Sequence, residues 1–335
     1  MSGTRPVASA TTEIMPGEFD NAGGGSAPPP PAVRKPRRGG WRRNFEIAVL
    51  SGPAVLVFVV FVIVPVIVAL YYSFFSWKGF GPTNADNFVG VKNYIWTLTN
   101  SSFWEAVGHN GIIMVASLVL QGPLAILVAL LLNKKMRGRS VIRILVFVPY
   151  VISEAIVGIG MFLMLQDAGA VNTLFGASIG WLSQPGVAMV TLMLILTWKY
   201  LGFAIILMLA GLQGIPEELS EASAVDGASY WQTQWHIMLP LLKPTIKIWA
   251  FLSIIGAMQL FDLVYVIWGQ YIASTAGVST MAWFMAANGR LSGQLGRGSA
   301  IAIIVFVISF IVAILYQRFV LNRDTEGALT QPEES

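Results

Sequence analysis

The chain of 335 residues contains no cysteine and only two histidines, His109 and His236. Without cysteine there is no disulfide framework, no thiolate metal site and no cysteine nucleophile, and two histidines are too few for a histidine metal cluster. Charge is also scarce, because Asp, Glu, Lys and Arg make up 11% of the residues, against about 25% in a soluble domain. Hydrophobic residues make up 55%. This composition predicts an integral membrane protein.

The sequence also lacks the common motifs of hydrolytic and transfer chemistry. It has no HExxH, no GxSxG and no Walker A stretch GxxxxGK[ST]. Because the phosphate-binding loop is missing, the chain cannot hydrolyse ATP by that mechanism. We predict no catalytic residue, no metal site and no bound cofactor, so a partner must supply the energy for any active process.

Six apolar runs are long enough to cross the hydrocarbon layer, which takes roughly 20 residues of helix. They cover about 47–71, 110–133, 141–165, 187–213, 246–268 and 299–321. The first run is longer than the core of a cleaved signal peptide, about 7 to 15 residues, so it is predicted to stay. These runs predict a membrane domain over 46–323.

A polar tail is predicted at each end of the chain, before and after the membrane domain. Residues 1–45 are rich in Pro, Gly, Ala and Ser and end in a basic cluster, and 324–335 are polar. Neither tail has an apolar face to bury, which favours disorder. The basic cluster is predicted to anchor the first span at anionic lipid headgroups, and nucleic-acid binding is not expected.

Lys and Arg predict the orientation of the spans. With the N-terminus in the cytoplasm, 16 of the 21 Lys and Arg residues fall on the inside and four on the outside, while Lys199 lies within a span. Such an excess sets membrane topology. Both termini and residues 215–244 are therefore predicted to be cytoplasmic.

Residues 215–244 read IPEELSEASAVDGASYWQTQWHIMLPLLKP, a polar and strongly patterned stretch between two apolar runs. Pro216 suits the first position of a helix, and the two glutamates after it place negative charge at the positive end of the helix dipole. This helix is predicted to end near Asp226, where Gly227 can take the positive φ of a C-terminal cap.

A second short helix is predicted from about Ser229 to Met238, stopped by Pro240, whose ring cannot continue a helix interior. The two helices would form a rigid, bent pair, here called the elbow (residues 215–244). The alternative is an ordinary amphipathic helix at the membrane surface between two spans.

The elbow carries a family resemblance. Glu221, Ala222 and Ser223, then Gly227, then Ile237 after nine intervening residues, followed by Leu239 and Pro240, resemble the EAA loop of binding-protein-dependent ABC importer permeases. The flanks IPEEL and LPLLKP are similar to the carbohydrate-importing, maltose-type branch. In that family the loop seats in a cleft on a cytoplasmic ATPase, so these residues and Asp226 are the predicted coupling residues. Ser223 stands where the family usually has a second Ala.

The resemblance implies an all-α, polytopic membrane protein with six transmembrane helices, the type I ABC importer permease fold, and a cytoplasmic coupling loop. It further implies a second homologous permease subunit, two cytoplasmic ABC ATPases that use ATP and Mg²⁺, and an extracytoplasmic sugar-binding protein. The chain would form half of the translocation pathway in the bacterial cytoplasmic membrane. It would not itself be an enzyme, and closure of the ATPases would alternate access to the site.

Three ionisable residues are predicted within the spans, where a charge costs about 2.5 to 3.5 kcal/mol even on lenient insertion scales. Glu154 and Lys199 are predicted near mid-depth, where they could pair, and Asp262 nearer the outer leaflet. Each is either a structural group within the bundle or a part of the transport path.

A sugar site combines aromatic faces with amide, hydroxyl or carboxylate groups. The candidate substrate residues are Tyr150, Glu154, Trp198, Lys199, Tyr200, Phe203, Gln259 and Asp262. All except Trp198 and Asp262 fall, along the resemblance, near positions that contact the sugar in maltose-type permeases. The alternative is that these aromatic residues only pack against neighbouring helices.

Two other classes of function remain open on the sequence. An ion- or proton-coupled secondary transporter would use intramembrane carboxylates directly and need no ATPase. A membrane-embedded enzyme or a purely structural subunit is the other rival. Both leave the pattern of the elbow unexplained, and co-purification with an ATPase in stoichiometric amount would discriminate against both.

Overall fold

The computed structural model describes residues 41–134 and 137–321. The predictions for residues 1–40 and for the C-terminal tail at 324–335 therefore lie outside the described residues. The first described helix begins at Trp41, so the predicted boundary of the N-terminal tail at residue 45 falls inside a helix.

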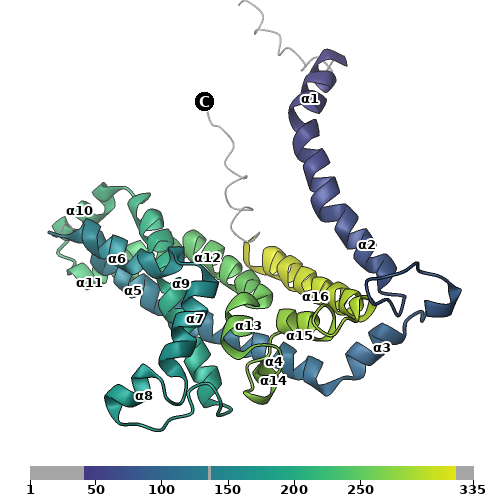
Figure 1. Ribbon diagram of the computed structural model, residues 1–335. Helices are drawn as coiled ribbons and strands as arrows, with labels where there is room; N and C mark the ends of the chain where they lie inside the picture. The colour runs from purple at the N-terminus through teal and green to yellow at the C-terminus, as the bar shows by residue number, and fades with distance from the viewer. Residues whose placement is uncertain (1–40, 135–136, 322–335) are drawn as a thin grey trace, which may run out of the picture. The chain divides into compact units, whose positions relative to one another are not determined.

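The described secondary structure is helical, apart from an isolated bridge between Phe75 and Phe88 (Figure 1). The helices, with π and 3₁₀ turns marked η, are α1 (Trp41–Phe58), η1 (Val59–Ile63), α2 (Val64–Tyr72), η2 (Ala85–Asn87), α3 (Lys92–Thr99), α4 (Ser101–Ala116), η3 (Ser117–Gln121), α5 (Gly122–Asn133), α6 (Arg139–Val151), α7 (Glu154–Leu165), α8 (Ala170–Phe175), α9 (Val187–Gln213), α10 (Glu217–Val225), α11 (Tyr230–Thr233), η4 (Gln234–Met238), α12 (Leu239–Gln259), α13 (Asp262–Trp268), α14 (Ile272–Thr275), α15 (Met281–Asn288), α16 (Leu295–Tyr316) and η5 (Gln317–Leu321).

Six helical runs among the described residues are long and apolar enough to cross a membrane, as predicted. They are Phe45–Tyr72, Ser101–Asn133, Glu154–Phe175, Val187–Gln213, Tyr230–Gln259 and Leu295–Leu321. The chain divides into two compact units, one ending at Val57 and one beginning at Phe58. The first holds nearly all of α1, an apolar helix with Pro53 inside it, and the second holds the other described elements.

Helix α9 lies at the centre of the second unit. Half of the residues in its most apolar stretch are buried, a larger share than in any of the other five runs. Helices α5, α6 and α12 pack against it, and α7 packs against α13 (Figure 1). Gly202 allows the closest approach, because a Cβ there would lie 2.1 Å from the carbonyl oxygen of Val146 on α6. On the other side of the unit, α16 packs against α2, α3 and α15.

Prolines follow three of the π turns. Pro65, Pro123 and Pro240 each lie two residues beyond the last residue of η1, η3 and η4. In each case the residue before the proline donates its N–H to the carbonyl five residues earlier, so the helical ladder skips one carbonyl. This wider turn makes room for a ring that would otherwise meet the carbonyl four residues back. The prediction that Pro240 stops the second helix of the elbow is therefore wrong, since the helix continues into α12.

Two of the predicted spans are broken in the middle. The run 141–165 is divided between α6 and α7 at Ile152 and Ser153, which have extended backbone, and the run 246–268 is divided between α12 and α13 at Leu260. A break within a membrane survives where buried polar groups pair with the freed backbone. The carbonyl of Leu260 accepts a hydrogen bond of 2.6 Å from the Thr280 hydroxyl, and Asn110 donates to the carbonyl of Ala257, also at 2.6 Å.

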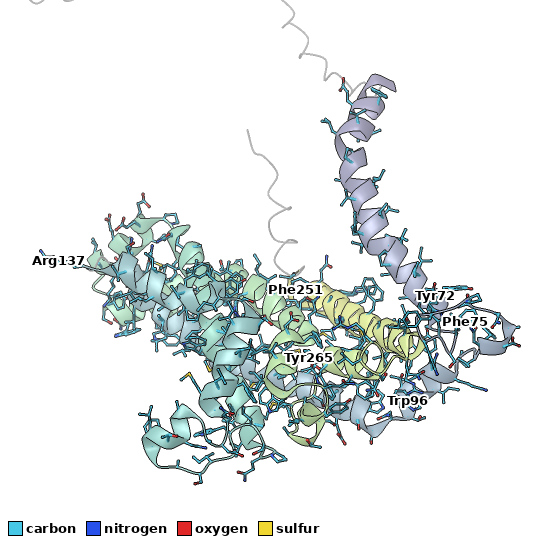
Figure 2. The ribbon with its side chains drawn as sticks, in the orientation of Figure 1. Tyr72, Phe75, Trp96, Arg137, Phe251 and Tyr265 are labelled. Atoms are coloured by element: carbon cyan, nitrogen blue, oxygen red, sulfur yellow. The ribbon has the colours of Figure 1, made fainter. Side chains whose placement is uncertain are left out.

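An aromatic cluster covers one end of α16 (Figure 2). The rings of Tyr72 and Trp77 stack with centroids 3.9 Å apart, and the Arg297 guanidinium lies 4.2 Å from the centroid of Trp96. Gly296 allows this packing, because a Cβ there would lie 1.9 Å from the carbonyl oxygen of Phe75. Amphipathic aromatic rings of this kind favour a membrane interface.

Candidate functional site

The elbow begins with α10, which is preceded by Pro216 at the N-cap, one residue earlier than predicted. At its other end the N–H of Gly227 donates to the Ala224 carbonyl (3.1 Å) and the N–H of Ala228 to the Ser223 carbonyl (3.0 Å). Gly227 has φ +80°. Two such bonds around a left-handed residue form a Schellman cap. The helix therefore ends where the pattern predicted.

The second arm, α11, is held at a fixed angle to α10 by polar side chains. Ser229 and Gln232 cap its start reciprocally, each side chain accepting from the backbone N–H of the other. The hydroxyls of Ser223 and Thr233 lie 2.8 Å apart, and both residues are buried. The serine that replaces the usual alanine thus bonds directly to the second arm. Each hydroxyl also lies within hydrogen-bond distance of a carbonyl of its own arm, that of Ser220 for Ser223 and that of Ser229 for Thr233. A fully paired buried polar network of this kind makes the elbow stiff.

The predicted coupling residues occupy different parts of the elbow. Glu221, Ala222, Asp226, Gly227 and Pro240 are exposed, Ile237 and Leu239 are half-buried, and Ser223 is buried. Three of them, Asp226, Gly227 and Ile237, line a shallow cleft of about 440 Å³ between the two arms, together with Gln232 and His236. Glu221 and Ala222 lie outside this cleft on α10.

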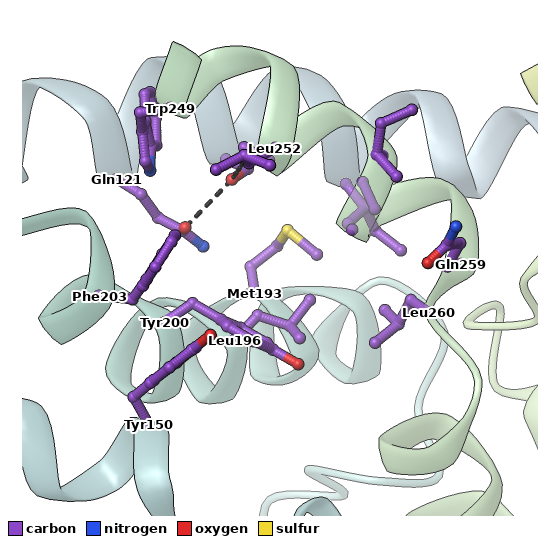
Figure 3. A pocket seen from close by; sticks show the side chains of 16 residues that line it. Gln121, Tyr150, Met193, Leu196, Tyr200, Phe203, Trp249, Leu252, Gln259 and Leu260 are labelled. Atoms are coloured by element: carbon purple, nitrogen blue, oxygen red, sulfur yellow. Dashed lines mark hydrogen bonds between the residues drawn. The ribbon is translucent and has the colours of Figure 1, made fainter. Parts of the chain in front are cut away.

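A second hollow, of about 330 Å³, lies within the bundle and is lined by residues of α4, η3, α6, α9 and α12 (Figure 3). Four of the candidate substrate residues meet there: Tyr150, Tyr200, Phe203 and Gln259. The rings of Tyr150 and Phe203 stack with centroids 4.9 Å apart. Among the described residues that line this cavity none is charged.

One wall of the cavity is a polar cluster of Ser117, Gln121 and Ser253, none of which we predicted. The Ser117 hydroxyl lies 2.6 Å from that of Ser253 and donates to the side-chain carbonyl of Gln121 at 3.1 Å. The side chain of Gln121 points into the cavity (Figure 3). The π turn before Pro123 places both Ser117 and Gln121 on this wall. Polar residues four apart in an apolar run, followed by proline, are the signal that could have identified them.

Comparison with known proteins identifies the family. A family model described as "Binding-protein-dependent transport system inner membrane component" matches residues 121–323, more than half of the chain. The chain belongs to this family. It is a multi-pass membrane permease, and the resemblance inferred from the elbow is confirmed.

Curated relatives of the permease are named as permease proteins of transport and uptake systems. The trehalose/maltose transport system permease protein MalF of Thermococcus litoralis is 34% identical over 269 residues, which cover 79% of this chain and 90% of the relative. The multiple sugar-binding transport system permease protein MsmF of Streptococcus mutans is 32% identical, covering 84% of this chain and 96% of the relative. The osmoprotective compounds uptake permease protein GgtC of a Synechocystis species is 29% identical, covering 76% and 92%.

The fold is shared with a solved structure, the crystal structure of a bacterial ABC transporter involved in the import of the acidic polysaccharide alginate. The TM-score is 0.72 at 21% sequence identity, and the match covers 87% of this chain and 98% of that chain. The ABC importer permease fold is therefore established for the described residues.

In this permease the two charged residues predicted at mid-depth lie beside the break between α6 and α7 and do not line the cavity. Lys199 is 2% exposed, and its ammonium donates to the carbonyl of Ile152 at 2.7 Å. Glu154 accepts a hydrogen bond from the Tyr200 hydroxyl. The sequence left open whether Lys199 pairs with Glu154, and the hydrogen bond that the structure gives its ammonium goes to the carbonyl of Ile152 at the break.

The other two candidate residues also lie outside the cavity of the permease. Trp198 is 46% exposed on α9, and Asp262 is exposed at the first turn of α13. An acidic residue in the first turn of a helix interacts favourably with the positive end of the helix dipole, which is a local structural role.

Proposed function

We propose that the permease is one of two transmembrane subunits of an ATP-driven importer for uncharged carbohydrates. The observation that carries the substrate class is the cavity, where stacked aromatic rings face an amide and hydroxyls and none of the described lining residues is charged. Aromatic rings cover the C–H faces of a sugar, and amides replace water around its hydroxyls. The names of two curated relatives, which refer to trehalose, maltose and multiple sugars, support a carbohydrate substrate.

The stiff, exposed elbow supports an ATPase partner. The chain lacks a Walker A stretch of its own, so ATP and Mg²⁺ would be bound by two cytoplasmic ATPase subunits that contact the elbow of this permease and of a homologous second one. An external binding protein would deliver the sugar. The bias of Lys and Arg supports placing the elbow and both termini in the cytoplasm.

Purification of the tagged chain from its native membrane tests this assembly. We expect a stoichiometric ATPase in the purified complex, with hydrolysis stimulated by sugar-loaded external binding protein. Screening that binding protein against a panel of neutral, acidic and phosphorylated sugars then tests the substrate class. A complex without any nucleotide-hydrolysing subunit, or a binding protein selective for charged sugars, would contradict the proposal.

Replacing Gln121 by leucine is expected to slow sugar import by about three- to tenfold, because one neutral hydrogen bond contributes about 1 kcal/mol. The preference among sugars should also change, since the amide contacts particular hydroxyls. Initial rates of import into proteoliposomes measure this. Gln166→Leu is the matched control, because that side chain lies outside the cavity and donates to the Leu163 carbonyl. Unchanged rates and preferences in Gln121→Leu would exclude the amide from the pathway.

A further inference from the structure

The C-terminal end of α5 rests on the second arm of the elbow. The last carbonyls of a helix have no partner within it. One of them, on the buried residue Leu130, accepts a hydrogen bond of 2.9 Å from the Tyr230 hydroxyl of α11. The ammonium of Lys134, the residue that ends α5, lies 3.6 Å from the centroid of the Tyr230 ring. One side chain of the elbow thus holds both the carbonyl end and the terminal cation of another span.

A hydrogen bond between the Ser223 and Thr233 hydroxyls joins the two arms of the elbow, which favours their movement as one unit. The elbow is also continuous with the fifth span, since α11 passes through η4 into α12 without interruption. Tyr230 adds a link to the second span, which contains α4, η3 and α5. These two spans form adjacent parts of the polar wall of the cavity: η3 carries Ser117 and Gln121, and α12 carries Ser253.

The two spans also fit closely against each other near the cavity. A Cβ at Gly122, the first residue of α5, would lie 2.8 Å from the ring of Trp249 on α12. Displacing α12 alone would therefore either open a gap at this contact or drive the indole into α5. If α5 and α12 move together, this contact is kept and neither a gap nor a clash arises. Close-packed interfaces change between discrete arrangements more readily than they deform.

We propose that Tyr230 is a positioning residue that carries the movement of the elbow into the second span, so that the two spans that form the polar wall of the cavity move together. This rests on the proposed ATP-driven function. The Tyr230 hydroxyl transmits the displacement of α11 to the backbone of α5. The Lys134 ammonium, which lies over the Tyr230 ring, keeps the end of α5 in position against α11. Capping the C-terminal end of α5 would not by itself require a tyrosine hydroxyl, since the Lys134 side chain can hydrogen-bond the last carbonyls of the helix.

The test uses the complete reconstituted complex and the number of sugar molecules imported per ATP hydrolysed. Tyr230→Phe keeps the ring and removes the hydroxyl, and it is expected to lower this ratio about threefold, the effect of one neutral hydrogen bond. Its Tm should fall no further than that of a control that also loses one hydrogen-bonded tyrosine hydroxyl. Lys134→Met should lower the ratio as well, and Lys134→Arg should retain it, because the guanidinium also stacks on the ring. Tyr94→Phe is the matched control, since it removes a tyrosine hydroxyl that lies 2.6 Å from the Ser73 hydroxyl, away from the elbow.

Two results would overturn the proposal. One is an unaltered ratio in Tyr230→Phe and Lys134→Met. The other is a lower ratio in Tyr230→Phe that comes with a larger fall in Tm than Tyr94→Phe shows, or a ratio that Tyr94→Phe lowers as much, because either result indicates a structural role. Failure of the ATP-driven function itself would appear separately, as import by the unaltered complex without ATP hydrolysis.

Discussion

Gly227→Asp is expected to lower sugar import by at least about tenfold while ATP hydrolysis continues. The residue has φ +80°, and left-handed backbone costs a residue with a Cβ about 1–2 kcal/mol. A Cβ there meets no atom within 4 Å, so the protein should still fold and insert. The strain loosens the cap of α10, and the new carboxylate stands beside exposed Asp226 in the cleft of the elbow. Import and ATPase rates, measured on the same complex, show the uncoupling.

Gly176→Asp is the matched control for this substitution. Gly176 also caps a short helix, α8, with φ +58° and open space around its Cβ position, but it lies outside the elbow. The control should import at close to the unaltered rate. If Gly227→Asp is assembled at the normal level and imports as fast as the unaltered complex, the elbow does not couple ATP hydrolysis to transport.

Lys199→Met is expected to lower both Tm and import, because it removes the donor to the Ile152 carbonyl at the break between α6 and α7. A buried carbonyl left without a partner costs about 1–3 kcal/mol. Misplacement of α6 would also shift Tyr150, which α6 carries into the cavity. We expect import to fall more than about tenfold, since small displacements of positioning residues have effects of that size. Thermal unfolding of the purified complex and proteoliposome uptake measure the two quantities.

Lys92→Met is a suitable control, since Lys92 is exposed at the start of α3, outside both the elbow and the cavity. Loss of import by Lys199→Met at an unchanged Tm would indicate instead that the ammonium contacts the transported molecule. Unchanged Tm and unchanged import together would mean that the break in the third span needs no buried donor.

Local rules explain why much of the elbow could be predicted from the sequence. A Schellman cap at Gly227 and a helix start at Ser229 depend on residues within one turn, so a short pattern is enough. Pro240 was misread because the effect of a proline depends on the turn before it, and a π turn accommodates the ring. The six spans were predictable for a different reason, since the bilayer imposes their length and composition.

The interior of the bundle was less predictable, because its geometry depends on contacts between distant residues. Tyr150, Tyr200, Phe203 and Gln259 do line the cavity, but Gln121 was missed, although its spacing from Ser117 and the proline after it were visible in the sequence. The breaks in the third and fifth spans depend on donors from other helices: Lys199 for Ile152, and Thr280 for Leu260. A sequence pattern along one span does not reveal a donor on another.

Alternating access requires helices that can change their arrangement without leaving backbone groups unpaired in the membrane. The two broken spans and the stiff elbow together provide such an arrangement in this permease. The elbow is continuous with one broken span, through α12, and the cavity lies against the other, through α6. Nucleotide-driven movement at the elbow would therefore reach the walls of the cavity directly.

Uptake into proteoliposomes that contain the purified complex tests the central claim most directly. With the sugar-loaded binding protein outside, we predict uptake that requires ATP inside the proteoliposomes, where the ATPase subunits lie. This uptake should persist when ionophores collapse every ion gradient. Uptake driven by an ion gradient in the absence of ATP would contradict the account and would establish a secondary transporter instead.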